Sequence, residues 1–129
     1  MFIVLVVLCF VMSQFSSASP SNSNTALTEA IAAHKAGDID LALRKYLIAT
    51  KTLSGAPACK VFSNIGALYM SKGGSGYLLA SKFFLKASEC DPGNPMPLFN
   101  LAVVQTSKLD DHAAAYESCL RVLRMDTAH

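Results

Sequence analysis

One packing template recurs three times along this chain, and it limits the fold more than any other feature. Each copy has a small residue, a second residue four positions later and a third residue three positions after that. The copies are Ala42, Tyr46 and Ala49; Ala80, Phe84 and Ala87; and Ala115, Cys119 and Val122, at intervals of 38 and 35 residues. Residues at this spacing share one face of a helix. Small side chains there let a second helix approach closely, and the bulkier one fills the gap. The template therefore predicts repeated, closely packed helix pairs.

Apolar residues at helical spacing fill the chain from about residue 25 onward. They divide into six segments of about 12–16 residues, within the usual length of helices in globular proteins. Glycine and proline separate the segments at Gly37, at 55–57, at 73–76 and at Pro92. Glycine favours left-handed backbone, and proline cannot continue a helix. No segment reads as a strand, so we expect an all-α fold.

Two helices per unit and a period of 34 to 38 residues resemble the tetratricopeptide repeat family. The middle unit matches the family pattern in both helices, at Phe62, Ile65, Gly66, Tyr69, Ala80, Phe84, Ala87 and Pro92. The first unit matches it at Gly37, Asp38, Ala42, Tyr46 and Ala49. The third unit matches it at Leu98, Leu101, Ala102 and Ala115, and has Leu109 near the place of the turn glycine.

The resemblance implies antiparallel helix pairs stacked as a right-handed superhelix, that is, an α-solenoid. It places one tetratricopeptide-like domain at residues 25–126, with repeats at approximately 25–54, 59–92 and 95–126. About two extra residues lengthen the middle unit around Gly73 to Gly76. An ordinary antiparallel helical bundle with accidental periodicity is the alternative.

The N-terminal segment differs from the rest of the chain. The run MFIVLVVLCFVM has twelve apolar residues, fewer than the roughly 20 that a helix needs to span a bilayer. It is typical of a secretory signal peptide, which we assign to residues 1–18, followed by a polar linker at 19–24. No Lys or Arg precedes the run, so an uncleaved membrane anchor or a cytosolic start is the alternative. We expect a secreted or lumenal protein, at a membrane only if this segment is retained.

Catalytic, cofactor-binding and metal-binding patterns are missing from the sequence. The histidines are scattered, at His34, His112 and His129. No HExxH, CxxC or phosphate-loop motif occurs. The glycine-rich run at 73–76 follows no strand and reads as a turn, and Asp110 and Asp111 read as a helix start. The net charge of +2 comes from scattered Lys and Arg, which argues against nucleic-acid binding. We expect neither enzymatic activity nor a cofactor.

First helices line the concave face of tetratricopeptide arrays, and that face binds extended peptides or partner helices. The resemblance implies a partner-binding surface made of Lys60, Asn64, Ala67, Ser71, Met96, Asn100 and Val103. Asn64 and Asn100 stand 36 residues apart, each just before an aliphatic residue of the pattern. In related arrays such amides contact the peptide backbone; the simpler alternative is that they bond neighbouring backbone or water.

The predicted function is a non-catalytic module that binds a protein or peptide. Binding of a chaperone's acidic tail is not expected, because apolar or amide side chains replace most of the required cations, at Leu27, Ile31, Met96 and Asn100. One alternative is the N-terminal arm or fragment of a larger secretory-pathway enzyme of the hydroxylase or glycosyltransferase type. Another is an assembly scaffold that forms homo-oligomers through an uncapped last helix pair. The apolar surface for this contact would come from Leu98, Tyr116 or Leu120.

Cys59 opens the first helix of the middle unit and Cys90 closes the second. In an antiparallel pair these ends are neighbours, so the two residues could form a disulfide in an oxidising compartment or remain free thiols. Cys119 falls on the bulky position of the third template copy and is expected to be a buried free thiol.

Overall fold

The computed structural model describes residues 23–127 and contains six helices within that range. They are α2 (Ser23–Ala36), α3 (Ile39–Ala49), α4 (Gly55–Lys72), α5 (Gly76–Cys90), α6 (Met96–Ser107) and α7 (His112–Thr127). This part of the chain holds no strand, which confirms the all-α prediction. The predicted signal peptide at 1–18 lies outside the described residues. Since α2 begins at Ser23, the last two residues of the predicted linker are helical.

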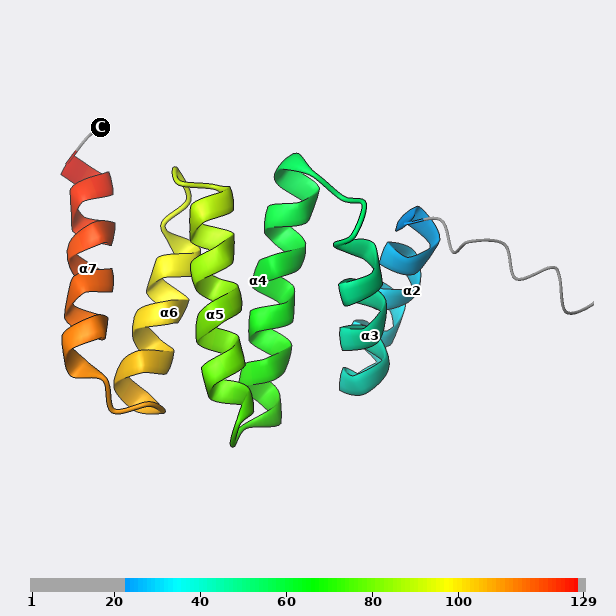
Figure 1. Ribbon diagram of the computed structural model, residues 1–129, viewed down its shortest axis with the longest axis horizontal. Helices are drawn as coiled ribbons and strands as arrows, with labels where there is room; N and C mark the ends of the chain where they lie inside the picture. Colours follow the sequence, from blue (N-terminus) through cyan, green and yellow to red (C-terminus); the bar gives the residue numbers. More distant parts are fainter. Residues whose placement is uncertain (1–22, 128–129) are drawn as a thin grey trace, which may run out of the picture.

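The helices follow one another in sequence order along the long axis of the molecule, from α2 at one end to α7 at the other (Figure 1). Each helix packs against the next one in the chain, and α4 and α5 share the most extensive interface. The contacts between α3 and α4 and between α5 and α6 join three helix pairs, α2–α3, α4–α5 and α6–α7.

The first two copies of the packing template form the centres of the two hydrophobic clusters. Tyr46 is 1% exposed and lies in a cluster made by α2, α3 and α4. Phe84, also 1% exposed, lies in a cluster made by α5 and α6. A Cβ atom at Gly66 of α4 would come within 2.8 Å of the Phe84 ring. The absence of a side chain at Gly66 therefore allows α4 and α5 to pack closely around Phe84.

The third copy of the template is arranged differently, and the predicted burial of Cys119 is wrong. Cys119 is exposed, whereas the preceding residue, Ser118, is buried and donates a hydrogen bond to Oε1 of Gln105 at 2.9 Å. Tyr46 and Phe84 each contact a helix of the next pair. Within residues 23–127 no helix follows α7, so the corresponding position on α7 has nothing to pack against.

The start of α4 also differs from the expectation. The sequence Gly55-Ala56-Pro57 was predicted to break the chain before the helix, but α4 begins at Gly55 and includes Pro57 in its first turn. Proline is tolerated there because the first backbone N–H groups of a helix have no partner within the helix.

Aspartates begin two of the helices. Oδ1 of Asp38 accepts a hydrogen bond from the backbone N–H of Leu41 at the start of α3, at 3.1 Å. Oδ1 of Asp111 accepts one from the N–H of Ala114 in α7, also at 3.1 Å. These bonds satisfy N–H groups that lack a partner in the helix. In the α6–α7 turn, where the other units have glycine, Asp110 adopts a φ of 52°, a conformation that aspartate tolerates better than most residues.

Among the described residues, no helix is both long and apolar enough to cross a membrane.

Candidate functional site

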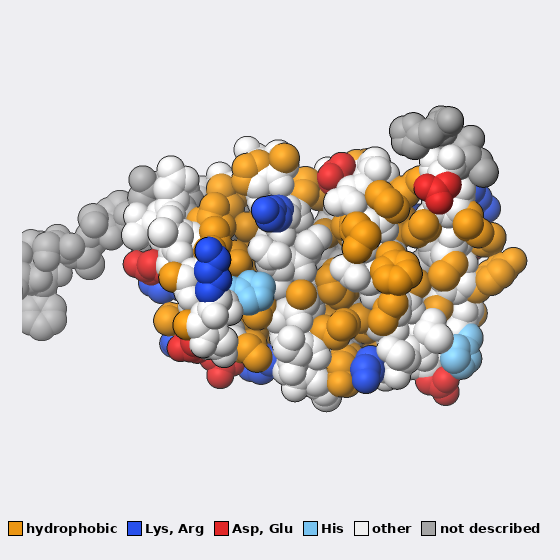
Figure 2. All heavy atoms as spheres, turned by 180° about the vertical axis from the view of Figure 1, so that it is seen from behind, with side chains coloured by type: hydrophobic (Ala, Val, Ile, Leu, Met, Phe, Trp, Pro, Cys, Tyr) orange, Lys and Arg blue, Asp and Glu red, His pale blue; other side chains and the backbone are white. Residues whose placement is uncertain are grey.

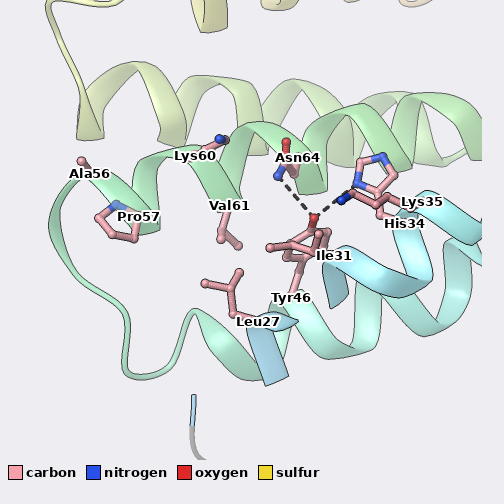
Figure 3. A pocket seen from close by; sticks show the side chains of 10 residues that line it. All are labelled: Leu27, Ile31, His34, Lys35, Tyr46, Ala56, Pro57, Lys60, Val61 and Asn64. Carbon is pink, nitrogen blue, oxygen red and sulfur yellow. Dashed lines mark hydrogen bonds between the residues drawn. The ribbon is translucent and has the colours of Figure 1, made fainter. Parts of the chain in front are cut away.

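A groove lies between α2 and α4, with α3 beneath it (Figure 3). We call it the α2–α4 groove. Its volume is about 750 Å³, within the range of about 300–1,000 Å³ that is common for ligand pockets. It is lined by Leu27, Ile31, His34, Lys35, Tyr46, Ala56, Pro57, Lys60, Val61 and Asn64.

Aliphatic side chains form the walls of the groove. Leu27 and Ile31 lie one helical turn apart on α2 and face Val61 of α4 in the view of Figure 3. Ile31 is 39% exposed, because α2 turns its alanines, such as Ala30, into the cluster. The groove thus presents an apolar surface to solvent rather than to another helix.

A polar network lies at the base of the groove, centred on the hydroxyl group of Tyr46 (Figure 3). Nδ2 of Asn64 donates to this hydroxyl oxygen at 3.4 Å, and Nδ1 of His34 lies 3.3 Å from it. Because Asn64 acts as the donor in the first contact, the Tyr46 O–H can donate to Nδ1 of a neutral His34. Burial raises the pKa of Tyr46, and the hydrogen bond from Asn64 opposes this effect. Tyr46 is therefore held in its neutral form.

Two lysines line the groove, and neither pairs with an acidic group of residues 23–127. Lys35 comes from the last turn of α2 and Lys60 from the second turn of α4. No carboxylate of the described part of the chain lines the groove. By contrast, Lys45 forms an ion pair with Glu29, and Lys72 forms one with Asp40 at 2.6 Å. Figure 2 shows basic and histidine side chains among hydrophobic ones at the end of the molecule that carries α2.

A smaller hollow of about 340 Å³ lies between α4 and α6. We call it the α4–α6 hollow. It shares Ala56 and Lys60 with the α2–α4 groove, so the two form a continuous surface over the first helix of each pair. It is also lined by Cys59, Ser63, Ala87, Asp91, Asn94, Met96, Pro97 and Asn100.

Four of the seven predicted partner-binding residues line these two surfaces. Lys60 and Asn64 line the groove, and Met96 and Asn100 line the hollow together with Lys60. The other predicted residues are exposed but line neither surface; they are Ala67, Ser71 and Val103. The nitrogen of the Asn64 amide donates to the Tyr46 hydroxyl group, a partner that the sequence analysis did not propose.

The predicted partner-binding surface did not include the α2 wall or the base of the groove. Nothing in the helical spacing of α2 distinguishes Ile31, which faces the groove, from the alanines that face the core. His34 and Tyr46 lie 12 residues apart in the chain, and their contact depends on the antiparallel packing of α2 on α3. His34 and Tyr46 could be recognised as residues of one site only once the packing of α2 on α3 was known.

A disulfide joins Cys59 in the second turn of α4 to Cys90, the last residue of α5. The two Cα atoms are 5.3 Å apart, and the sulfur atoms are bonded at 2.00 Å. This bond links the start of α4 to the end of α5, at the end of the pair opposite the turn that joins the two helices. Because Cys59 also lines the α4–α6 hollow, the disulfide fixes one end of that surface.

No group of three or more His, Cys, Asp or Glu side chains that could hold a metal occurs in the part of the chain that the structure describes. No model of a known protein family matches the sequence, and no curated protein matches it either.

Proposed function

We propose that this chain is a non-catalytic protein-binding module, built as a short tetratricopeptide-like array, that holds a segment of a partner protein in the α2–α4 groove. The observation that carries the proposal is the groove itself. It combines an apolar wall, from Leu27, Ile31 and Val61, with polar atoms at its base and lysines in its lining. Recognition sites commonly combine such an apolar lining with a few placed polar groups.

The arrangement of the helices supports the proposed array. The three helix pairs contact one another in sequence order, as expected when each unit packs only on its neighbours. Gly66 and Phe84 fit together at the positions of the family pattern. The first helices of successive pairs contribute to the continuous surface formed by the groove and the hollow.

We further propose that the protein matures in the secretory pathway. The Cys59–Cys90 disulfide supports this location, because disulfides persist in oxidising compartments and are rare in the cytosol.

The test is a selection of peptides from a random displayed library against the full chain, followed by fluorescence anisotropy of the enriched peptides. We expect micromolar binding that weakens by about tenfold, or ~1.4 kcal/mol, when Ile31→Glu places a charge in the apolar wall. Ile48→Glu is the matched control, since Ile48 is similarly exposed, at 36% against 39%, and lines no part of the groove. Enriched peptides that bind equally well to both variants would contradict the proposed site.

Self-assembly is a second candidate function, and the apolar surface of the last helix pair favours it. Hydrophobic side chains gather over the α6–α7 end of the face shown in Figure 2. Phe99 is 55% exposed, Tyr116 67% and Leu123 59%, whereas Leu98, one of the expected contact residues, is fully buried. If a second copy covers this end, sedimentation equilibrium will report a dimer that Tyr116→Glu converts to a monomer. A monomeric wild-type protein at high concentration would reject this candidate.

A further inference from the structure

We propose that the partner segment held in the α2–α4 groove carries a bulky apolar side chain with one or more carboxylates within a few residues of it. This inference rests on the proposed function and specifies the chemistry of the partner. The apolar side chain would lie against Leu27, Ile31 and Val61, and the carboxylates would face the ammonium groups of Lys35 and Lys60.

The apolar requirement follows from the walls of the groove. Ile31 and Leu27 on α2 and Pro57 and Val61 on α4 offer a continuous hydrophobic lining, and burial of a partner's apolar side chain there removes both surfaces from water. The volume of about 750 Å³ leaves room for a large side chain together with the backbone around it.

The carboxylate requirement follows from charges that the protein leaves without a partner. Lysines elsewhere on α3 and α4 form ion pairs within the protein, Lys45 with Glu29 and Lys72 with Asp40. Lys35 and Lys60 have no such ion pair among the described residues, and no acidic side chain lines the groove. A partner carboxylate would therefore meet two cations without having to displace an acid of the protein.

The position of these cations makes them complementary to an acid next to the apolar side chain. Lys35 and Lys60 come from two different helices, and in the view of Figure 3 their ammonium groups lie on either side of Asn64. The Nδ2 atom of Asn64 donates to Tyr46. The lysines are thus the groups that would select for negative charge, while Asn64 holds the base of the groove in place.

The experiment repeats the displayed-peptide selection with the full chain and with a charge-reversed variant, Lys35→Glu with Lys60→Glu. We expect wild type to enrich peptides in which a bulky apolar residue lies near Asp or Glu, and the variant to enrich peptides with Lys or Arg there instead. The acidic wild-type peptides should bind the variant on the order of tenfold more weakly. Their affinity for wild type should also fall as salt screens the charges.

A matched control separates the site from the overall charge of the protein. Lys51→Glu with Lys82→Glu changes the net charge equally, and both lysines are exposed and line no part of the groove. This control should select the same acidic peptides as wild type. Circular dichroism melting curves will show whether each variant is folded before the selections are compared.

The possible failures are distinguishable. Peptides that require Ile31 but show no acidic preference, or no change of preference in the charge-reversed variant, would overturn this inference and leave the proposed function standing. A loss of acidic preference in the Lys51 and Lys82 control would also overturn it, because the preference would then reflect net charge. If no peptide requires Ile31, both proposals fall together.

Discussion

The ring of Phe84 lies so close to Gly66 that a Cβ atom at residue 66 would stand 2.8 Å from two of its carbon atoms. Such a distance is shorter than van der Waals contact, and Phe84 is only 1% exposed, so its ring cannot swing into solvent. The packing of α4 on α5 thus depends on the absence of a side chain at Gly66.

Gly66→Ala is expected to destabilise the protein by about 1–2 kcal/mol in urea denaturation. Overpacking of a core costs about 1–3 kcal/mol, and the better helix propensity of alanine, worth about 1 kcal/mol, offsets only part of it. A smaller side chain in Phe84→Leu should make room for the new methyl group, so the cost of Gly66→Ala should shrink in that background. An equal loss of stability from Gly66→Ala in wild type and in Phe84→Leu would show that the Phe84 ring does not limit the space at residue 66.

Tyr46→Phe should lower the free energy of unfolding by about 1 kcal/mol, the usual net contribution of a buried hydrogen bond. It removes the hydroxyl group that Asn64 and His34 contact. Tyr116→Phe is the control, since Tyr116 is 67% exposed, and it should leave stability unchanged. The same loss in both variants would argue against the network at the base of the groove.

The pKa of Tyr46, raised by burial, predicts a change of stability at high pH. The neutral form is favoured in the folded state, so this contribution is fully present below the unfolded pKa of about 10. It is lost as pH rises through the higher folded pKa. Urea denaturation should therefore show a steeper loss of stability above pH 10 for wild type than for Tyr46→Phe. Parallel stability profiles for the two proteins would indicate that ionisation of Tyr46 does not destabilise the folded state.

Removal of the disulfide by Cys59→Ser with Cys90→Ser should destabilise the protein by about 2–4 kcal/mol, since the bond limits the freedom of the unfolded chain. It closes a loop between residues 31 positions apart. Cys119→Ser is the control, because Cys119 is an exposed free thiol, and it should change stability little. Non-reducing peptide mapping provides the direct check, and free Cys59 in native protein would contradict the pairing.

Lys72→Ala should raise the pKa of Asp40 toward its usual value, as measured by carbon NMR of the carboxyl group. Lys72 lowers that pKa first through its hydrogen bond at 2.6 Å and then through its charge. Arg44 acts more weakly, so Arg44→Ala should produce a smaller rise. Equal effects of the two substitutions would mean that the ion pair is not formed in solution.

The residues that could be predicted from the sequence are those whose helical spacing marks a buried face and that a neighbouring helix then covers. Ala80 and Phe84 are buried as expected, because their spacing and the small residues opposite them are both visible in the chain. The exposure of Cys119 could not be predicted in this way. Its position on the template is the same, but burial there also requires a further helix.

The groove was harder to predict than the fold for a related reason. Lys60 and Asn64 could be proposed from the pattern of a single helix. The partner of Asn64, however, is Tyr46, which lies 18 residues earlier. The apolar wall depends on how far α2 is rotated about its own axis, and an alanine-rich helix has little side-chain bulk to fix that rotation in advance. That Lys35 pairs with no acid of residues 23–127 likewise becomes visible only when the positions of those acids are known.

The covalent link between α4 and α5 has a consequence for how the molecule opens. Contacts within each helix pair are more extensive than contacts between pairs, so the outer pairs can detach without separating the middle one, whose two helices the disulfide joins at one end. Amide hydrogens should therefore exchange with solvent first in α2, α3, α6 and α7 and last in α4 and α5. Transient fraying of α2 would open one wall of the groove while the other wall stays in place, so the rate of that local opening would set how quickly a bound segment can leave.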